Sequence, residues 1–202
     1  MTVAATTELE AINIMMAAIG ESPVNTLTGT LPADVVMARS TLTEINKQVQ
    51  SEGWSFNTEI DVTLTRDSSN NINLSSDVLR VDANIHQHPT INPIQRGLKL
   101  YDRQNNTFVF EEDLICTVVY LRTFAEIPEQ ARYYITIRAA RLFVDRLVGD
   151  DGLRTYTQQD ETRARVILTE TDYANADHNL LRGDPSLTSI FDTYNPSSAL
   201  IR

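Results

Sequence analysis

Three adjacent acidic residues, Glu111, Glu112 and Asp113, are the side chains of this sequence with the most direct capacity for chemistry. Glycoside hydrolases place two carboxyl groups on either side of the bond they cleave, one as a general acid and the other as a base or nucleophile. Neighbouring acids do not meet that demand alone, because the fold must supply a second carboxyl group at the right separation. A solvated acidic turn is the simpler interpretation, and polysaccharide hydrolysis stays as an alternative.

His86 and His88 could offer two imidazoles to a metal ion. Alternate residues share one face only in a regular strand, and Pro89 and Pro93 interrupt this stretch. No other histidine or cysteine lies nearby in the sequence, so we expect no metal site. The single cysteine, Cys116, lies in an apolar run and is expected to be a small buried hydrophobe instead of a nucleophile. The scattered glycines form no phosphate-binding loop, and we expect no cofactor.

A third constellation consists of Arg138, Arg141 and Asp145, which are spaced three and four residues apart and therefore share one face of a helix. Charged side chains in so apolar a segment need partners, because an unpaired buried charge is costly. The partners could lie within the chain, as an internal salt bridge, or on a neighbouring subunit. Only Lys47 and Lys99 among the 17 basic residues are lysine, and arginine is the cation favoured at protein interfaces.

The overall charge limits the class of function. The chain has 202 residues, a net charge of −10 and a pI of about 4.7, which argue against a protein that grips nucleic acid through a basic surface. They are compatible with an acidic channel through which a duplex slides without being held. The N-terminus lacks the basic residues of a secretory signal and no apolar stretch approaches membrane-spanning length, so we expect a soluble protein with no membrane partner.

The elements that must position these residues are helical at both ends of the sequence. Thr7 and Glu10 form a capping box at the start of a helix expected over residues 7–19, and Gly20 is placed to end it. A second helix is expected from Pro32 to Gly53, with one apolar stripe formed by Val35, Ala38, Leu42, Ile45 and Val49. A central, mostly apolar helix is expected over residues 128–148 and a long fourth helix over residues 153–181.

Between the helical halves the hydrophobic period changes to two, as in β-strands. Phe56, Ile60, Val62 and Leu64 alternate, and further short strands are expected over residues 78–81, 98–101, 107–110 and 115–121. The sequence therefore predicts an α+β fold: a bundle of four main helices, two N-terminal and two C-terminal, with an inserted, mostly antiparallel β-region and an extended C-terminal tail. The expected divisions are residues 1–53 with 123–183 (bundle), 54–122 (β-region) and 184–202 (tail). Trp54 and Phe56 are expected to anchor the β-region to the bundle.

Several short motifs occur in order along most of the chain. The most characteristic is a helix containing Leu42, Ile45 and Asn46, followed by Gln50 and a Gly-Trp-x-Phe-Asn sequence that leads into a strand. The stretches that carry motifs are residues 18–27, 39–46, 50–57, 101–103, 127–133 and 140–143. Each stretch alone is a weak signal, but together and in this order they resemble the tail tubular protein A family of short-tailed bacteriophages.

This resemblance implies a structural protein of the virion tail that is assembled in the host cytoplasm. It implies a homo-oligomeric ring, in this family a dodecamer, which joins the portal protein to the tail nozzle protein and gives the nozzle or tail fibres a place to attach. Double-stranded DNA would pass through the ring without specific binding. Residues 66–93 and the C-terminal tail match no family motif, and we expect the tail to dock on the portal through Asp184, Phe191, Tyr194 and Arg202. The alternatives are a tail-associated polysaccharide hydrolase and a free-standing oligomeric binding protein.

Overall fold

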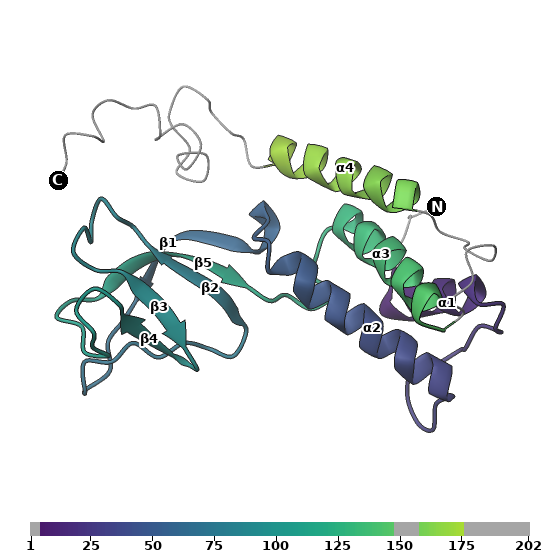
Figure 1. Ribbon diagram of the computed structural model, residues 1–202, viewed down its shortest axis with the longest axis horizontal. Coiled ribbons are helices and arrows are strands. Elements are labelled where there is room, and N and C mark those ends of the chain that lie inside the picture. Colours follow the sequence, from purple (N-terminus) through teal and green to yellow (C-terminus); the bar gives the residue numbers. More distant parts are fainter. Residues whose placement is uncertain (1–4, 148–157, 176–202) are drawn as a thin grey trace.

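The computed structural model describes residues 5–147 and 158–175, and within them the fold is α+β as predicted. The helices of this part are α1 (Glu8–Ala18), α2 (Ala33–Gln50), α3 (Glu129–Leu147) and α4 (Gln158–Asn175). α3 is the central helix, since α1, α2 and α4 all pack against it (Figure 1). The prediction that the third helix is central is confirmed.

The N-terminal helices begin and end where the sequence indicates. The Thr7 backbone N–H donates to the Glu10 carboxylate (2.7 Å), and the Glu10 N–H donates to the Thr7 hydroxyl (3.2 Å), so the predicted capping box is present. Gly20 follows α1 with a φ of +81°, a conformation that glycine adopts without strain. The apolar residues predicted to form the stripe of α2 are all buried: Val35, Ala38, Leu42, Ile45 and Val49.

The strands form an antiparallel region between α2 and α3. A short 3₁₀ helix, η1 (Ser55–Asn57), precedes a three-stranded sheet of order β1-β5-β2 and a separate β3–β4 hairpin. The strands are β1 (Thr58–Leu64), β2 (Val78–Ala83), β3 (Pro93–Arg96), β4 (Lys99–Asp102) and β5 (Leu114–Tyr120).

Two separate hydrophobic cores result from this order. All four helices contribute to the first core, which includes Ile12, Ile45, Tyr134 and Phe143. The second core lies within the β-region and includes Ile72, Leu100, Leu114, Cys116 and Val118. Each part of the chain therefore buries its own apolar surface, which is the main source of stability for a folded unit.

Three expectations for the β-region are wrong. Residues 107–110 form no strand, because Thr107 makes an isolated bridge with Asp102 across a turn and the chain then leaves the hairpin, where the Phe110 N–H donates to the Asn70 carbonyl (2.9 Å). Pro93 was expected to interrupt the chain but begins β3, a position where its missing N–H is tolerated. A β-bulge in β1 between Glu59 and Val62 breaks the expected alternation and leaves Ile60 59% exposed.

The remaining predictions concern the C-terminal part of the chain. Residues 158–175 of the predicted fourth helix are helical, whereas 153–157 and 176–181 lie outside the described residues. The predicted tail, with Asp184, Phe191, Tyr194 and Arg202, also lies outside them. Within the part that the structure describes, no helix is both long and apolar enough to cross a membrane.

Candidate functional site

Two buried amides, Gln50 and Asn57, join the helical part to the β-region. The Gln50 side chain donates to the Arg122 carbonyl (2.9 Å) and accepts from the Arg122 N–H (2.7 Å). The Asn57 amide donates to the carbonyls of Gln50 (2.9 Å) and Tyr120 (2.8 Å). The end of α2 and the end of β5 are therefore tied side by side, at the two places where the chain crosses between the cores. The family resemblance contains both amides, but only the fold reveals that they bond to residues 120–122.

Trp54 and Phe56 lie at the same junction. The Trp54 ring is 8% exposed within the helical core, and its indole N–H donates to the Val49 carbonyl (2.9 Å). Phe56 is partly buried against the same core. Gly53 precedes them with a φ of +81°, and a Cβ there would lie 2.9 Å from the Arg80 guanidinium. Both aromatic rings thus contact the helical part from the start of the β-region, and their anchoring role stays a prediction.

A polar seam between α3 and α4 contains the three charged residues singled out in the sequence. The Arg141 guanidinium contacts Glu161 (2.6 Å) and Asp145 (3.2 Å), and Arg138 lies 3.7 Å from the other Glu161 oxygen. These side chains are 17–26% exposed. The internal pairing that the spacing allowed is thus formed, while a contact of Arg138, Arg141 and Asp145 with another subunit stays a prediction.

The seam extends toward the end of α2 through Tyr134. The Tyr134 hydroxyl accepts hydrogen bonds from Arg138 (2.9 Å) and Arg165 (3.2 Å). Arg165 also pairs with Glu52 (2.7 Å), which follows α2. The pKa of Arg165 is raised, mainly by its hydrogen bond with Tyr134 and further by its contact with Glu52, while burial opposes both. The partners Glu52, Glu161 and Arg165 could not be predicted from the sequence, because they lie outside α3 and no spacing rule connects them to it.

The acidic cluster is engaged in structural contacts. Glu112 bonds to Nδ1 of His88 (2.7 Å), whose Nε2 accepts from the Ile115 N–H (3.0 Å). Asp113 accepts from the Arg66 backbone N–H (3.0 Å) and pairs with its guanidinium (3.1 Å), and these contacts hold the pKa of Asp113 below its ordinary value. A general acid of a glycosidase needs a raised pKa, so the shift at Asp113 is opposite to that requirement.

The other candidates for chemistry lie in equally unsuitable surroundings. Cys116 is fully buried in β5, and burial raises the pKa of its thiol to about 12, so it is protonated and inaccessible at neutral pH. His86 is exposed, whereas His88 is buried and bonded to Glu112. Within residues 5–147 and 158–175, no three histidine, cysteine or acidic side chains come together as metal ligands would.

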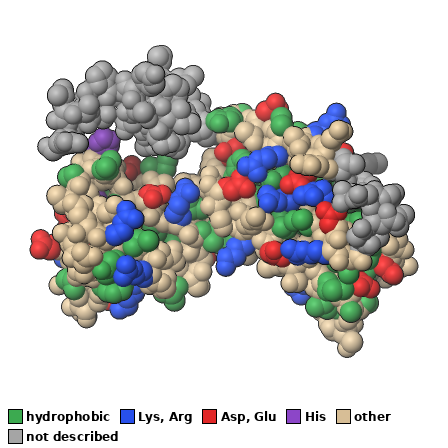
Figure 2. Space-filling view, viewed as in Figure 1, with side chains coloured by type: hydrophobic (Ala, Val, Ile, Leu, Met, Phe, Trp, Pro, Cys, Tyr) green, Lys and Arg blue, Asp and Glu red, His purple; other side chains and the backbone are tan. Residues whose placement is uncertain are grey.

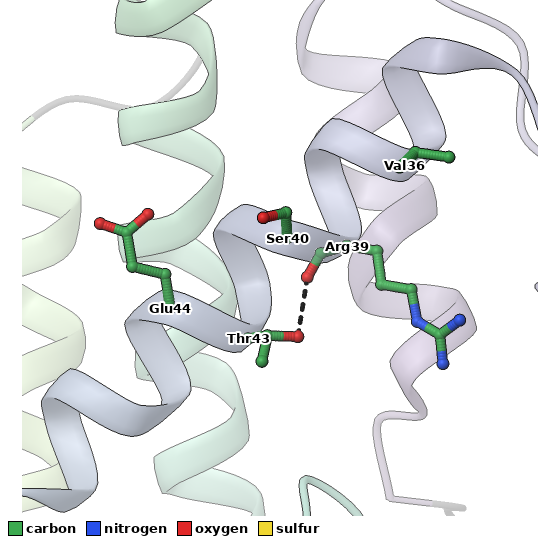
Figure 3. Close-up of a pocket in the computed structure, with 5 residues that line it drawn as sticks. All are labelled: Val36, Arg39, Ser40, Thr43 and Glu44. Carbon is green, nitrogen blue, oxygen red and sulfur yellow. Dashed lines mark hydrogen bonds between the residues drawn. The ribbon is translucent and has the colours of Figure 1, made fainter.

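A shallow groove on the outer face of α2 is the hollow that Figure 3 shows, lined by Val36, Arg39, Ser40, Thr43 and Glu44. Its middle is formed by two small residues, and Thr43 uses its hydroxyl to bond the Arg39 carbonyl (2.9 Å). The charged side chains at its rim pair within the chain, Arg39 with Glu8 (2.9 Å) and Glu44 with Arg146 (2.8 Å). The groove offers a contact surface and no arrangement of acid, base or nucleophile.

Comparisons with known proteins identify the family. A family model described as tail tubular protein matches residues 9–178, which include both the helical part and the β-region. The chain is also 29% identical over 166 residues to tail tubular protein A of Klebsiella phage KP34, an alignment that covers 81% of this chain and 86% of the relative. The resemblance seen in the sequence is thereby confirmed. The chain belongs to the tail tubular protein family, and it is a structural component of the phage tail.

Proposed function

We propose that this protein is a ring-forming head-to-tail adaptor that joins the portal to the tail nozzle and extends the DNA channel. The observation that carries the proposal is the family match over residues 9–178, because it covers the helical part and the β-region together. The ring is a homo-oligomer, in keeping with the family a dodecamer. Each subunit uses one part to stack against its neighbours and another to face the next component of the tail.

The proposed division of labour follows the two cores. Residues 1–53 and 123–183 form the unit that stacks within the ring, where Arg138, Arg141 and Asp145 lie near a neighbouring subunit. Residues 54–122 face the nozzle and give tail fibres a place to attach, with Trp54 and Phe56 as the anchor to the helical unit. Residues 184–202 dock on the portal through Asp184, Phe191, Tyr194 and Arg202.

The charge of the chain supports the proposed passage of DNA. A net charge of −10 gives the subunit an overall field that repels phosphates. A ring of such subunits surrounds double-stranded DNA without specific binding, which suits a conduit through which the genome moves. The rival function, polysaccharide hydrolysis, receives no support from the acidic cluster, because Glu112 bonds to His88, Asp113 pairs with Arg66, and the pKa of Asp113 is lowered.

Electron microscopy of the purified chain, alone and after mixing with the portal protein of the same phage, tests the proposal. We expect rings of twelve subunits, either free or seated on the portal. Compact monomers that persist even when the portal is present would reject the adaptor role. Release of reducing sugar from host polysaccharide, lost in a variant with alanine at Glu111, Glu112 and Asp113, would favour the hydrolase instead.

A further inference from the structure

The outer face of the β3–β4 hairpin combines aromatic, aliphatic and basic side chains. Ile94 pairs with Tyr101 and Arg96 with Lys99, so these four side chains lie on the same face. The Arg96 guanidinium lies 3.5 Å from the centroid of the Tyr101 ring, and Phe108 meets that ring edge-on at 4.9 Å between centroids. Ile94 is 41% exposed and Phe108 is 39% exposed. We call Ile94, Arg96, Lys99, Tyr101 and Phe108 the hairpin face.

The cations of the hairpin face are left without ion pairs. Neither Arg96 nor Lys99 lies within ion-pair distance of a carboxylate of the described residues, and Lys99 only exerts a longer-range attraction that helps to lower the pKa of Asp67. Figure 2 shows basic and hydrophobic side chains together over the hairpin, whereas basic and acidic ones alternate over the helices. Most other arginines of the described part form ion pairs: Arg39, Arg66, Arg80, Arg122, Arg138, Arg141, Arg146 and Arg165.

A surface of complementary character lies at the bulge of β1. Ile60 is 59% exposed and Ile85 is 70% exposed, although both are large hydrophobic residues. Asp61, which follows Ile60 in the bulge, has a φ of +56° and accepts a hydrogen bond from the Asn84 amide (3.4 Å). Asn84 precedes Ile85, so this bond connects the bulge to the turn after β2. The Asp61 carboxylate forms no ion pair with any residue that the structure describes. We call Ile60, Asp61 and Ile85 the bulge patch.

We propose that the hairpin face of one subunit docks on the bulge patch of the next copy of this chain. The inference rests on the proposed ring, and it adds to the stacking of the helical units a second contact between the β-regions of neighbouring subunits. β1 and the hairpin lie on opposite sides of the β-region (Figure 1), so one copy can contact two neighbours. Contact between two different patches is a head-to-tail arrangement, which produces rings when the rotation closes. A two-fold dimer would instead require one patch to contact itself.

The chemistry of the hairpin face favours a protein over nucleic acid. Stacked arginine and tyrosine side chains are typical of the buried centres of protein interfaces, where they contribute most of the binding energy. The exposed Ile94 and Phe108 gain from contact with Ile60 and Ile85 through removal of apolar surface from water. Arg96 and Lys99 gain an acidic partner in Asp61, so that apolar and charged groups both find complements.

Cross-linking tests the contact directly, since the native Cys116 is buried and gives no background. Ile60→Cys and Leu98→Cys place thiols in the bulge patch and at the exposed hairpin turn, where Leu98 is 56% exposed. With a short bismaleimide, the variant that carries both changes is expected to give a ladder of covalent oligomers on denaturing gels. On the same denaturing gels, each single variant is expected to run as an uncross-linked monomer. Dimers from a single variant would indicate a two-fold contact and overturn the proposal.

Charge reversal supplies the second measurement. Arg96→Glu combined with Lys99→Glu is expected to weaken subunit association by about 100-fold in sedimentation analysis, because like charges then face Asp61. Lys47→Glu, at the other lysine of the chain and on the exposed side of α2, is the matched control and is expected to leave association within about threefold. Unchanged association of the hairpin variant, with circular dichroism like that of the wild type, would overturn the proposal. The proposal would also be overturned if the wild type binds duplex DNA and the Arg96→Glu, Lys99→Glu variant loses that binding.

The outcomes separate this inference from the adaptor proposal. Closed rings without the cross-linked ladder would reject the contact and keep the adaptor. A ladder of cross-linked chains that never close or seat on the portal would keep the contact and reject the adaptor. If neither rings nor a cross-linked ladder is observed, both the adaptor proposal and the proposed contact are rejected.

Discussion

Gln50 illustrates at the level of one residue how the two parts of the chain are held together. Its side chain is fully buried and satisfies both the N–H and the carbonyl of Arg122. Gln50→Ala leaves both backbone groups without that partner, and we expect a loss of about 2–3 kcal/mol in the free energy of unfolding. Urea denaturation of the wild type and the variant measures this difference in the free energy of unfolding. Gln48→Ala, the same change on the exposed side of α2, is the control and is expected to cost less than about 0.5 kcal/mol.

Asp102 gives the hairpin a dependence on pH. Its burial on its own raises the pKa, but hydrogen bonds from Asn92, Asn105 and Gln104 outweigh it and hold the pKa below the ordinary value of 3.8. A lowered folded-state pKa means that the stabilisation is present above about pH 3.8 and is lost as the pH falls through the folded-state pKa.

The variant Asp102→Asn tests this contribution. At neutral pH we expect it to lose about 1–3 kcal/mol, because the amide replaces a carboxylate that accepts three hydrogen bonds. The difference from the wild type is expected to shrink as the pH falls below 3.8, as measured by thermal unfolding from pH 7 to pH 3. Glu21→Gln, at an exposed residue after α1, serves as the control. A difference that stays constant with pH would contradict the prediction.

Among the helices, α4 depends most on polar contacts. Only Ala164 and Leu168 of this helix are buried, so its contact with α3 relies on Glu161, which pairs with both Arg138 and Arg141. Glu161→Ala leaves two half-buried guanidinium groups with fewer partners, and we expect a cost of about 1–3 kcal/mol. Amide hydrogen exchange is expected to accelerate within residues 158–175 far more than in α1. Glu170→Ala, on the exposed side of α4, is expected to leave exchange unchanged.

The sequence predicts the helices better than the strands, and the reason is physical. Periodicity and capping act within a few residues, so the Thr7–Glu10 box and the stripe of α2 were visible before any fold was known. Strand pairing and bulges depend on distant segments, which explains the failures at Ile60, Pro93 and residues 107–110.

The candidate sites follow the same rule. The spacing of Arg138, Arg141 and Asp145 placed them on one face of α3, but their main partner, Glu161, lies on another helix and was not predicted. The sequence does not predict the hairpin face, for the same reason. Its stacked Arg96 and Tyr101 are five residues apart and come together only because β3 pairs with β4.

For the whole molecule, the proposed docking tail can be separated from the folded part by truncation. Among the described residues, the members of both hydrophobic cores all precede residue 176. We therefore expect a chain that ends at residue 183 to keep the circular dichroism spectrum and thermal midpoint of the full chain. If residues 184–202 dock on the portal, the truncated chain is expected to bind it at least about tenfold more weakly in a sedimentation assay. A truncated chain that is unfolded would show that the tail belongs to a core.

The paired amides at the junction also determine how the two halves of the molecule share mechanical load. The backbone crosses between the cores twice, and Gln50 and Asn57 bond these crossings to each other. Because two backbone segments fastened side by side must move past each other when the junction twists, we expect it to resist torsion more than bending. A pull on the β-region is divided between two covalent paths, which lead into α2 and α3. The N–H and hydroxyl of Ser55 donate to Asp172 of α4 (2.9 and 2.6 Å) and add a non-covalent path beside them.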